Sequence, residues 1–339
     1  MTFSVGAETK KYDIIIESGA INNAGRLFDL DRRVLILTDD GVPEEYSKIV
    51  AGQCRKPVIF TVKAGEKSKS ISVWENALSL MLENGFDRYD CVVAVGGGVC
   101  GDLAGFVASA YMRGVDFYNI PTTVLSQVDS SIGGKTAVNF GKVKNIIGAF
   151  YPPCGVIIDT SLLSTLLWRQ IANGLAESVK MALTFDSELF ELIEKEDINK
   201  IIPEVIERSL LIKKRVVEED EKESGVRKVL NFGHTIGHGI ESLGGGLYHG
   251  ECVALGMLPM CSDEVRKRLV EVLKKLGLPY RCDTLDPEKI AEAVAHDKKS
   301  HGDRITAVLV DKVGEYRLES VPMPWLKERI DMLVKGNLI

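Results

Sequence analysis

Three of the five histidines in this 339-residue chain fall within one short stretch, at positions 234, 238 and 249. Imidazole is the commonest metal ligand in proteins and a ready proton carrier near neutral pH. His234 and His238 are four residues apart, so a helix would place both rings on one face. The cluster indicates a metal site, and a structural or hydrogen-bonding role is the alternative.

A glycine-rich loop follows the wholly apolar run 91–95. Its sequence, from Gly96 through Gly98, Val99, Cys100 and Gly101 to Asp102, fits the pattern Gly-x-Gly-x-x-Gly between a predicted strand and a predicted helix. Such a loop lets backbone amides approach a diphosphate, and a tight turn is the alternative. The loop lies about 90 residues into the chain with no acidic residue about 20 positions later, a departure from the usual N-terminal dinucleotide fold.

A second polar run, residues 121–139, follows another predicted strand. It contains Thr122, Thr123, Asp129 and Lys135, and it is too polar to be plain core. Gly-Gly-Lys135-Thr is like the end of a phosphate-binding P-loop, but the upstream glycine is missing because position 129 is Asp. Nucleoside triphosphate hydrolysis is therefore excluded.

The elements that must position these residues divide the chain into two parts. Strands are predicted at 11–16, 33–38, 57–62 and 91–95, with a helix at 70–84 between the last two. After residue 159 helical spacing dominates, as in 201–219, with a probable strand at 305–310 as the exception. We predict an α/β domain with a mostly parallel sheet at 1–158 and an all-α domain at 159–339.

The composition excludes several classes of protein. A net charge of −6 argues against nucleic-acid or anionic-membrane partners, and no apolar stretch reaches the roughly 18 residues of a membrane span. The seven cysteines form no Cys-x-x-Cys pair, which disfavours a disulfide framework or a zinc–thiolate site. With no signal peptide visible at the start, we expect a cytoplasmic protein.

Taken together, these motifs closely resemble the 3-dehydroquinate synthase family of sugar-phosphate cyclases. The matching segments run in order through nearly the whole chain, and the most specific is Gln127 to Asn139. That stretch belongs to the matching segment 121–139, and the others are 65–70, 96–106, 111–114, 144–152, 174–180, 231–238, 249–257 and 296–299. One departure is Leu167-Trp168-Arg169-Gln170, where the family commonly has Pro-Pro-Arg-Glu. It lies beside the expected nucleotide loop, and we interpret it as tolerated variation.

The resemblance implies an NAD-binding first domain, a helical second domain that binds a divalent metal and the substrate, and a cleft between them. The implied reaction converts 3-deoxy-D-arabino-heptulosonate 7-phosphate into 3-dehydroquinate with loss of phosphate. The implied metal ligands are Glu177, His234 and His249, with His238 as a substrate-facing proton relay rather than a ligand. Zinc and cobalt both suit such a donor set.

The resemblance also implies a set of NAD-binding residues. They are Asp39, Glu66, Lys69, Gly98 to Asp102, Thr122, Thr123, Lys135, Lys144, and the loop Leu162, Leu163, Ser164 and Thr165. For Asp39 and Glu66 the alternative is a solvated loop carboxylate. For Thr165 helix capping is an equal alternative.

The family's substrate carries a carboxylate and a phosphate, so it needs cations at separate points. Candidate catalytic and substrate-binding residues are Asp129, Lys135, Lys144, Asn145, Lys180, Lys213, Arg227, Asn231 and Lys298, and Arg113 is expected to reach the site of a neighbouring subunit in a homodimer. The forked guanidinium of Arg227 suits a carboxylate.

Three alternative functions remain open at this point. The first is another cyclase on the same scaffold, such as a 2-deoxy-scyllo-inosose or valiolone-type synthase, whose substrates lack the carboxylate. The apparently intact set Lys213, Arg227, Asn231 and His238 favours the dehydroquinate reaction over these. The second is a metal-dependent polyol dehydrogenase of the glycerol dehydrogenase type, and the third is a non-catalytic NAD sensor.

Overall fold

The computed structural model describes residues 1–6, 10–141, 143–221, 225–282, 284–297, 304–336 and 338. Within it the chain divides into two compact units, Met1–Leu166 and Leu167–Ile339. The segment 160–165 belongs to the first unit because Leu162 packs into that unit's core. Whether the units divide NAD binding from metal and substrate binding stays a prediction.

The first unit is built on a seven-stranded sheet with the order β1-β2-β9-β6-β5-β3-β4. Its strands are β1 (Thr2–Gly6), β2 (Lys11–Ile16), β3 (Arg33–Asp39), β4 (Lys56–Val62), β5 (Cys91–Gly96), β6 (Asp116–Pro121) and β9 (Gly155–Ile158). Only the β1–β2 pair at the edge is antiparallel. Four of the strands predicted from sequence are β2, β3, β4 and β5, and all four are confirmed within a residue.

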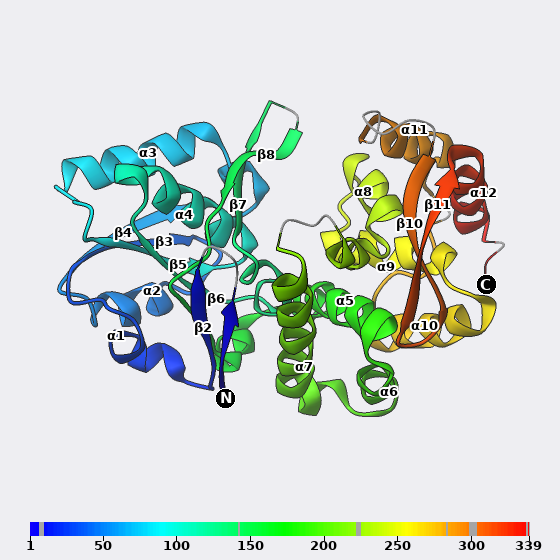
Figure 1. The fold of residues 1–339 in the computed structure, drawn as a ribbon, viewed down its shortest axis with the longest axis horizontal. Helices are drawn as coiled ribbons and strands as arrows, with labels where there is room; N and C mark the ends of the chain where they lie inside the picture. The colour runs from blue at the N-terminus through cyan, green and yellow to red at the C-terminus, as the bar shows by residue number, and fades with distance from the viewer. Residues whose placement is uncertain are drawn as a thin grey trace. The chain divides into compact units, whose positions relative to one another are not determined.

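Helices cover both faces of this sheet (Figure 1). They are α1 (Ala24–Leu27), α2 (Glu44–Ala51), α3 (Ile71–Glu83) and α4 (Gly98–Ala110), with short turns η1 (Ala20–Asn23), η2 (Glu66–Ser68) and η3 (Tyr111–Arg113). Successive side chains of a strand point to opposite faces. Leu35 and Val92 therefore join the core beneath α3 and α4, while Ile36 and Val93 join the core beneath α2.

A two-stranded hairpin, β7 (Lys135–Phe140) with β8 (Val143–Phe150), stands beside the main sheet and projects upward in Figure 1. It follows a short π-helical segment, η4 (Ser126–Ser130), and precedes β9 and the turn η5 (Thr160–Thr165). The hairpin was not predicted. It holds several of the residues that the family resemblance implicates.

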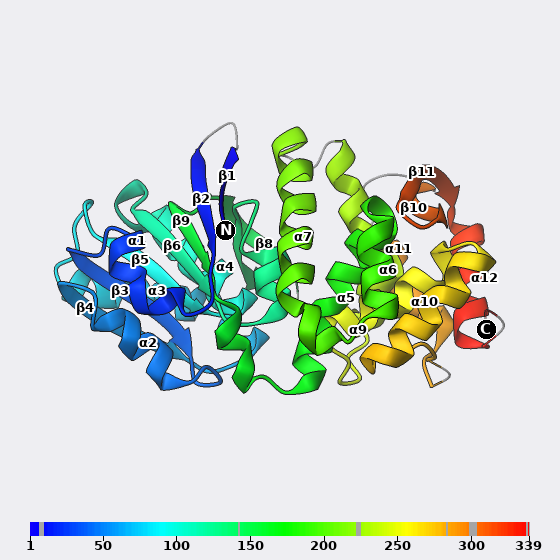
Figure 2. The ribbon, with the colours of Figure 1, turned by 90° about the horizontal axis from the view of Figure 1, so that it is seen from below.

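The second unit is mainly helical (Figure 2). It contains α5 (Trp168–Phe185), α6 (Ser187–Lys195), α7 (Ile198–Glu219), α8 (His234–Ser242), α9 (His249–Met257), α10 (Asp263–Leu276), α11 (Pro287–Asp297) and α12 (Met323–Val334). Two 3-10 turns, η6 (Val226–Asn231) and η7 (Leu258–Met260), lead into α8 and α10. The periodicity at 201–219 is confirmed as the greater part of α7.

An antiparallel hairpin, β10 (Arg304–Lys312) with β11 (Glu315–Pro322), is the strand structure of this unit among the described residues. The predicted strand at 305–310 is thus confirmed, while its partner β11 was not anticipated. The architecture is the predicted one, a mostly parallel α/β unit followed by a helical unit. Among the described residues, no helix combines the length and apolar character needed to cross a bilayer.

Candidate active site

In the first unit the predicted NAD-binding residues gather at one edge of the sheet. Asp39 ends β3, Glu66 follows β4, Gly98 follows β5, Thr122 follows β6, and η5 follows β9. All five strands are parallel, so these positions lie at the carboxyl edge, where open α/β sheets bind their ligands.

The glycine loop passes from β5 directly into the first turn of α4. The carbonyl of Gly96 accepts a hydrogen bond from the amide of Thr122, 2.9 Å away. A Cβ on Gly98 would lie 3.1 Å from the Ser130 hydroxyl. The loop is therefore close-packed by polar neighbours. The N-cap of α4, Gly97, makes no side-chain cap hydrogen bond. Since the first amides of a helix have no acceptor within the helix, this end of α4 suits an anion.

Polar contacts order the loops around this edge. The Cys100 thiol donates to Asp39 across 3.1 Å, and the side-chain amide of Asn139 donates to Glu66 across 2.8 Å. Burial, reinforced by Asp39, raises the pKa of the Cys100 thiol well above its usual value, so it stays a donor.

Lys69 is an enclosed charge at this edge, with its side chain 5% exposed. Its ammonium contacts both the carboxylate of Asp102 and the side-chain oxygen of Asn145. Asn145 itself has a positive φ of 56°, a conformation that non-glycine residues rarely adopt. The structure thus brings together four predicted residues, 66, 69, 102 and 145, from three different segments.

Other predicted residues of this unit lie more openly. Lys135 and Lys144 are exposed on β7 and β8, and Asp129 is half-buried on η4. Arg113 is exposed, and both it and Met112 have positive φ, 69° and 51°. Two consecutive strained residues are costly and are commonly kept at functional positions.

The predicted nucleotide loop 162–165 is half buried and half exposed, and its contact with NAD stays a prediction. The side chains of Leu162 and Leu163 are buried, so any contact with a cofactor there would use their backbone. Ser164 and Thr165 are exposed.

In the second unit the three histidines form the expected cluster. His234 and His238 lie on α8 with their ring centroids 5.2 Å apart, and His249 begins α9 with its ring 5.2 Å from that of His234. One nitrogen from each ring lies within 4.8 Å of the others, close enough to share a metal ion. His238 is exposed whereas the other two are half-buried.

Glu177 completes the cluster from α5 and is fully buried. Its Oε1 lies 3.5 Å from His234 Nε2 and 3.6 Å from His249 Nε2, too far for good hydrogen bonds. Neither carboxylate oxygen has a hydrogen-bond partner among the described residues, although Oε2 is ion-paired with Lys180. A buried carboxylate oxygen facing two imidazole nitrogens is a set of donors that fits a divalent cation.

The far nitrogens of both imidazoles are held in place. His249 Nδ1 donates to the Glu241 carboxylate across 2.9 Å, and His234 Nδ1 donates to the Phe232 carbonyl across 3.1 Å. Each bond leaves Nε2 as the nitrogen that faces Glu177. A hydrogen bond from the ring nitrogen that does not face the metal is typical of metal-binding histidines. Glu241 was missed from the sequence, although it lies seven residues after His234 and so shares its helical face.

The charges of the cluster are strongly perturbed. Burial alone would raise the pKa of Glu177, but Lys180 and the two imidazoles outweigh it and hold the pKa well below its usual value. Burial, and next the charge of Lys180, lowers the pKa of His234 to about 3. Burial would also lower the pKa of His249, yet the carboxylates of Glu177 and Glu241 raise it to about 10.

Three cations are buried near the cluster's supporting helices. Lys180 on α5 is 2% exposed, Lys213 on α7 is 5% exposed, and Arg227 on η6 is 3% exposed. These three elements pack against one another. Lys180 is ion-paired with Glu177, and Arg227 donates to the Glu221 carbonyl, so part of this positive charge is already satisfied within the unit. The grouping of three buried cations on adjoining elements is compatible with an anionic ligand. Asn231 ends η6, and Lys298 lies outside the described residues.

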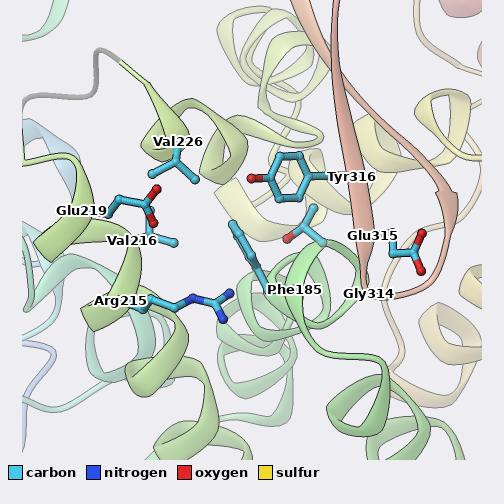
Figure 3. A pocket seen from close by; sticks show the side chains of 9 residues that line it. Phe185, Arg215, Val216, Glu219, Val226, Gly314, Glu315 and Tyr316 are labelled. Atoms are coloured by element: carbon cyan, nitrogen blue, oxygen red, sulfur yellow. The ribbon is translucent and has the colours of Figure 1, made fainter.

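A separate cavity of about 570 Å³ lies between the end of α5, α7 and the β10–β11 turn (Figure 3). The rings of Phe185 and Tyr316 meet edge-on across it, and Arg215 lies against Phe185. None of the predicted site residues lines it, so it is not the candidate active site.

Comparison with known proteins decides the family. Residues 59–173 match the family model described as 3-dehydroquinate synthase N-terminal, and residues 174–300 match 3-dehydroquinate synthase C-terminal. A 3-dehydroquinate synthase of Enterococcus faecalis is 40% identical over 95% of this chain and 96% of its own length. The chain belongs to the 3-dehydroquinate synthase family. It is accordingly an enzyme, a lyase of the shikimate pathway, as the resemblance implied.

Solved structures extend the family to its superfamily. A 2-deoxy-scyllo-inosose synthase complexed with carbaglucose-6-phosphate, NAD⁺ and Co²⁺ has a TM-score of 0.87 and 27% identity, covering 97% of this chain and 99% of its own. The 2-epi-5-epi-valiolone synthase of Streptomyces hygroscopicus subsp. jinggangensis, with NAD⁺ and Zn²⁺ bound, has a TM-score of 0.87 and 26% identity, covering 98% and 99%. The fold is thus that of the sugar-phosphate cyclases.

Proposed function

We propose that the chain converts 3-deoxy-D-arabino-heptulosonate 7-phosphate into 3-dehydroquinate and phosphate, with NAD and a divalent metal, zinc or cobalt, as cofactors. The observation that carries this proposal is the buried Glu177 carboxylate, whose Oε1 faces the Nε2 atoms of His234 and His249. The solved cyclase relatives with NAD⁺ and Co²⁺ or Zn²⁺ support the choice of cofactors.

Glu177, His234 and His249 would hold the metal. When bound, the metal lowers the pKa of substrate hydroxyls that it contacts. Metal binding requires neutral imidazoles, so the proton that His249 holds through its raised pKa must leave as the ion enters. Lys180 stays paired with the second oxygen of Glu177 and keeps that carboxylate ionised.

The carboxyl edge of the first sheet would hold NAD. The amides that begin α4 suit its diphosphate, and Asp39, oriented by Cys100, suits a ribose hydroxyl. When bound, NAD takes a hydride from the substrate and later returns it, so it is not consumed. Lys69, fixed by Asp102 and Asn145, would keep this loop cluster ordered.

His238 would act as the proton relay of the reaction. It is the exposed member of the cluster, next to the two proposed ligands, so a substrate proton could reach its ring without disturbing the metal. Its role is to accept the proton from the hydroxyl on carbon 5 as that carbon is oxidised. The new ketone acidifies the neighbouring carbon–hydrogen bond, and phosphate then leaves with its own oxygen as the base.

The buried cations would bind the substrate's anionic groups. Arg227 can bind a carboxylate with two parallel hydrogen bonds. Lys213 comes from the adjoining α7, and Asn231 ends the same turn, η6. Asp129, Lys135, Lys144, Asn145 and Lys298 complete the proposed set of polar contacts. We further propose a homodimer in which Arg113, held in its strained conformation, serves the partner's site.

The carboxylate-binding cations give the sharpest test against other cyclases. Purified protein with NAD and zinc should release phosphate from the heptulosonate phosphate and not from glucose 6-phosphate, which lacks a carboxylate. Arg227→Met should raise KM for the heptulosonate phosphate at least tenfold. Equal or faster turnover of glucose 6-phosphate would contradict the proposal and favour the deoxy-inosose reaction.

A further inference from the structure

One face of α5 contacts the start of α9 at three successive levels. Arg169, Asn173 and Glu177 are spaced four residues apart and so lie in a row along the helix. Arg169 binds Glu251, Asn173 binds the amide of Gly250, and Glu177 faces His249. The row on α5 therefore matches three consecutive residues of α9, in reverse order along the chain.

The outer level is a two-pronged ion pair. Arg169 donates from Nε and Nη2 to the two oxygens of Glu251 across 2.7 and 2.8 Å, and also to the Gly246 carbonyl across 2.7 Å. Glu251 is 5% exposed and accepts the backbone amide of Tyr248 across 2.7 Å, closing the cap of α9. The Arg169 guanidinium also lies over the Tyr248 ring, 4.3 Å from its centroid.

The middle level sets how closely the two helices approach. Asn173 Oδ1 accepts the amide of Gly250 across 2.6 Å. A Cβ on Gly250 would fall 1.9 Å from the Asn173 carbonyl oxygen, which no side chain could tolerate. The start of α9 is thus seated on α5 one residue away from His249.

We propose that Arg169 and Asn173 are positioning residues for the metal site, because they fix the helix start from which His249 projects. This inference rests on the proposed metal role of Glu177, His234 and His249. Helix α5 then supplies one proposed ligand, Glu177, and also fixes the position of α9, which supplies another, His249. Loss of either contact should let α9 shift against α5, and groups that orient metal ligands typically change metal affinity about 10- to 100-fold.

The test measures Co²⁺ binding to metal-free protein, by competition with a chromophoric chelator and by the visible absorption of the bound ion. Arg169→Ala and Asn173→Ala should each weaken Co²⁺ binding about tenfold or more and shift the absorption bands. Arg169→Lys keeps the positive charge but cannot donate to both oxygens of Glu251 at once, so its Co²⁺ affinity should lie between those of Arg169→Ala and the unaltered protein. His249→Ala, which removes a ligand, should weaken binding further than any of them.

A matched control comes from another two-pronged pair of the same unit. Arg268 on α10 donates to both oxygens of Glu194 on α6 across 2.9 and 2.7 Å. Arg268→Ala should lower thermal stability by about as much as Arg169→Ala does, while leaving the Co²⁺ affinity and the absorption spectrum unchanged. A merely structural role for Arg169 would make the two variants alike.

Two results would overturn the inference, and they are distinguishable. If Arg169→Ala and Asn173→Ala bind Co²⁺ with unchanged affinity and spectrum while His249→Ala does not, the metal site stands and the positioning role fails. If His249→Ala itself binds Co²⁺ as the unaltered protein does, the proposed metal site and the inference fail together.

Discussion

Replacement of Glu177 by Gln should destabilise the metal-free protein far more than its small change in shape suggests. The variant keeps the volume of the side chain but leaves Lys180, which is 2% exposed, without its ion-pair partner. Removing one partner of a buried pair costs about 3–5 kcal/mol, because the other charge stays buried. For a unit of this size the midpoint of thermal unfolding should fall by roughly 6–20 °C.

The pKa of Glu177 also predicts how the stability difference between the two proteins changes with pH. Glu177 has a folded-state pKa well below its ordinary value of 4.5, so its stabilisation is fully present above pH 4.5. That contribution is lost as the pH falls through the depressed folded-state pKa, where the native carboxylate takes up its proton. The gap in unfolding free energy between the two proteins should therefore be widest near neutral pH and should narrow in acid.

The assay is circular dichroism of both proteins, thermally unfolded after removal of metal by chelation. Glu194→Gln is the control, since it also separates a carboxylate from its cation, here Arg268, but in a partly exposed pair worth about 0–1 kcal/mol. If Glu177→Gln unfolds within about 4 °C of the unaltered protein, as the control should at roughly 2–4 °C per kcal/mol, then the buried pair is not the coupled unit that we describe.

Three other changes test separate parts of the site. Metal affinity should rise about tenfold per pH unit between pH 7 and 9, because the metal must displace the proton that His249 holds with a pKa of about 10. Calorimetric titration of the metal into the protein across this pH range measures the affinity. Gly256→Ala should weaken metal binding and lower the temperature midpoint of unfolding, because the new Cβ would lie 2.0 Å from the Gly233 carbonyl oxygen and push α9 away from α8. Gly52→Ala is the control for both measurements, because its Cβ would lie 3.5 Å from the nearest atom. Lys69→Met should raise KM for NAD several-fold in steady-state assays, because Asp102 and Asn145 both lose the ammonium that they contact. An unchanged KM would count against NAD binding at this edge of the sheet.

Much of the scaffold could be predicted from local sequence patterns. The apolar run 91–95 is buried on both sides because it lies in the middle of a parallel sheet, and such strands lack polar alternation. Ser70 caps α3 through the amide of Val73, so the predicted start of that helix follows from a single side chain. The spacing of His234 and His238 likewise fixes their common face on α8.

The rest depends on contacts between distant segments, which spacing does not reveal. The β7–β8 hairpin carries exposed apolar side chains such as Phe140 and Ile146, so it shows no buried face in the sequence. The positive φ of Asn145 is set by the hairpin around it. Spacing alone pairs His234 with His238, and these two do share a candidate metal cluster. Glu177, the ligand that we propose in place of His238, lies 57 residues before His234 and meets it only in the folded unit.

The departure at Leu167-Trp168 now has a structural setting. Both residues precede or begin α5, and the Trp168 indole donates to the Leu276 carbonyl across 2.9 Å, which anchors the helix start to the end of α10. Arg169, the residue of this segment that keeps the family's type, makes the contact with α9. The variation thus affects how α5 is anchored and leaves the row that faces the metal site in place.

The number of phosphate ions released per NAD molecule tests the central claim most directly. Protein with zinc, one equivalent of NAD and excess 3-deoxy-D-arabino-heptulosonate 7-phosphate should release many phosphates per NAD, with no lasting rise in NADH absorbance. Chelation of the metal should stop the release, and added zinc or cobalt should restore it. No phosphate release, or NADH that accumulates in step with substrate consumed, would contradict the account.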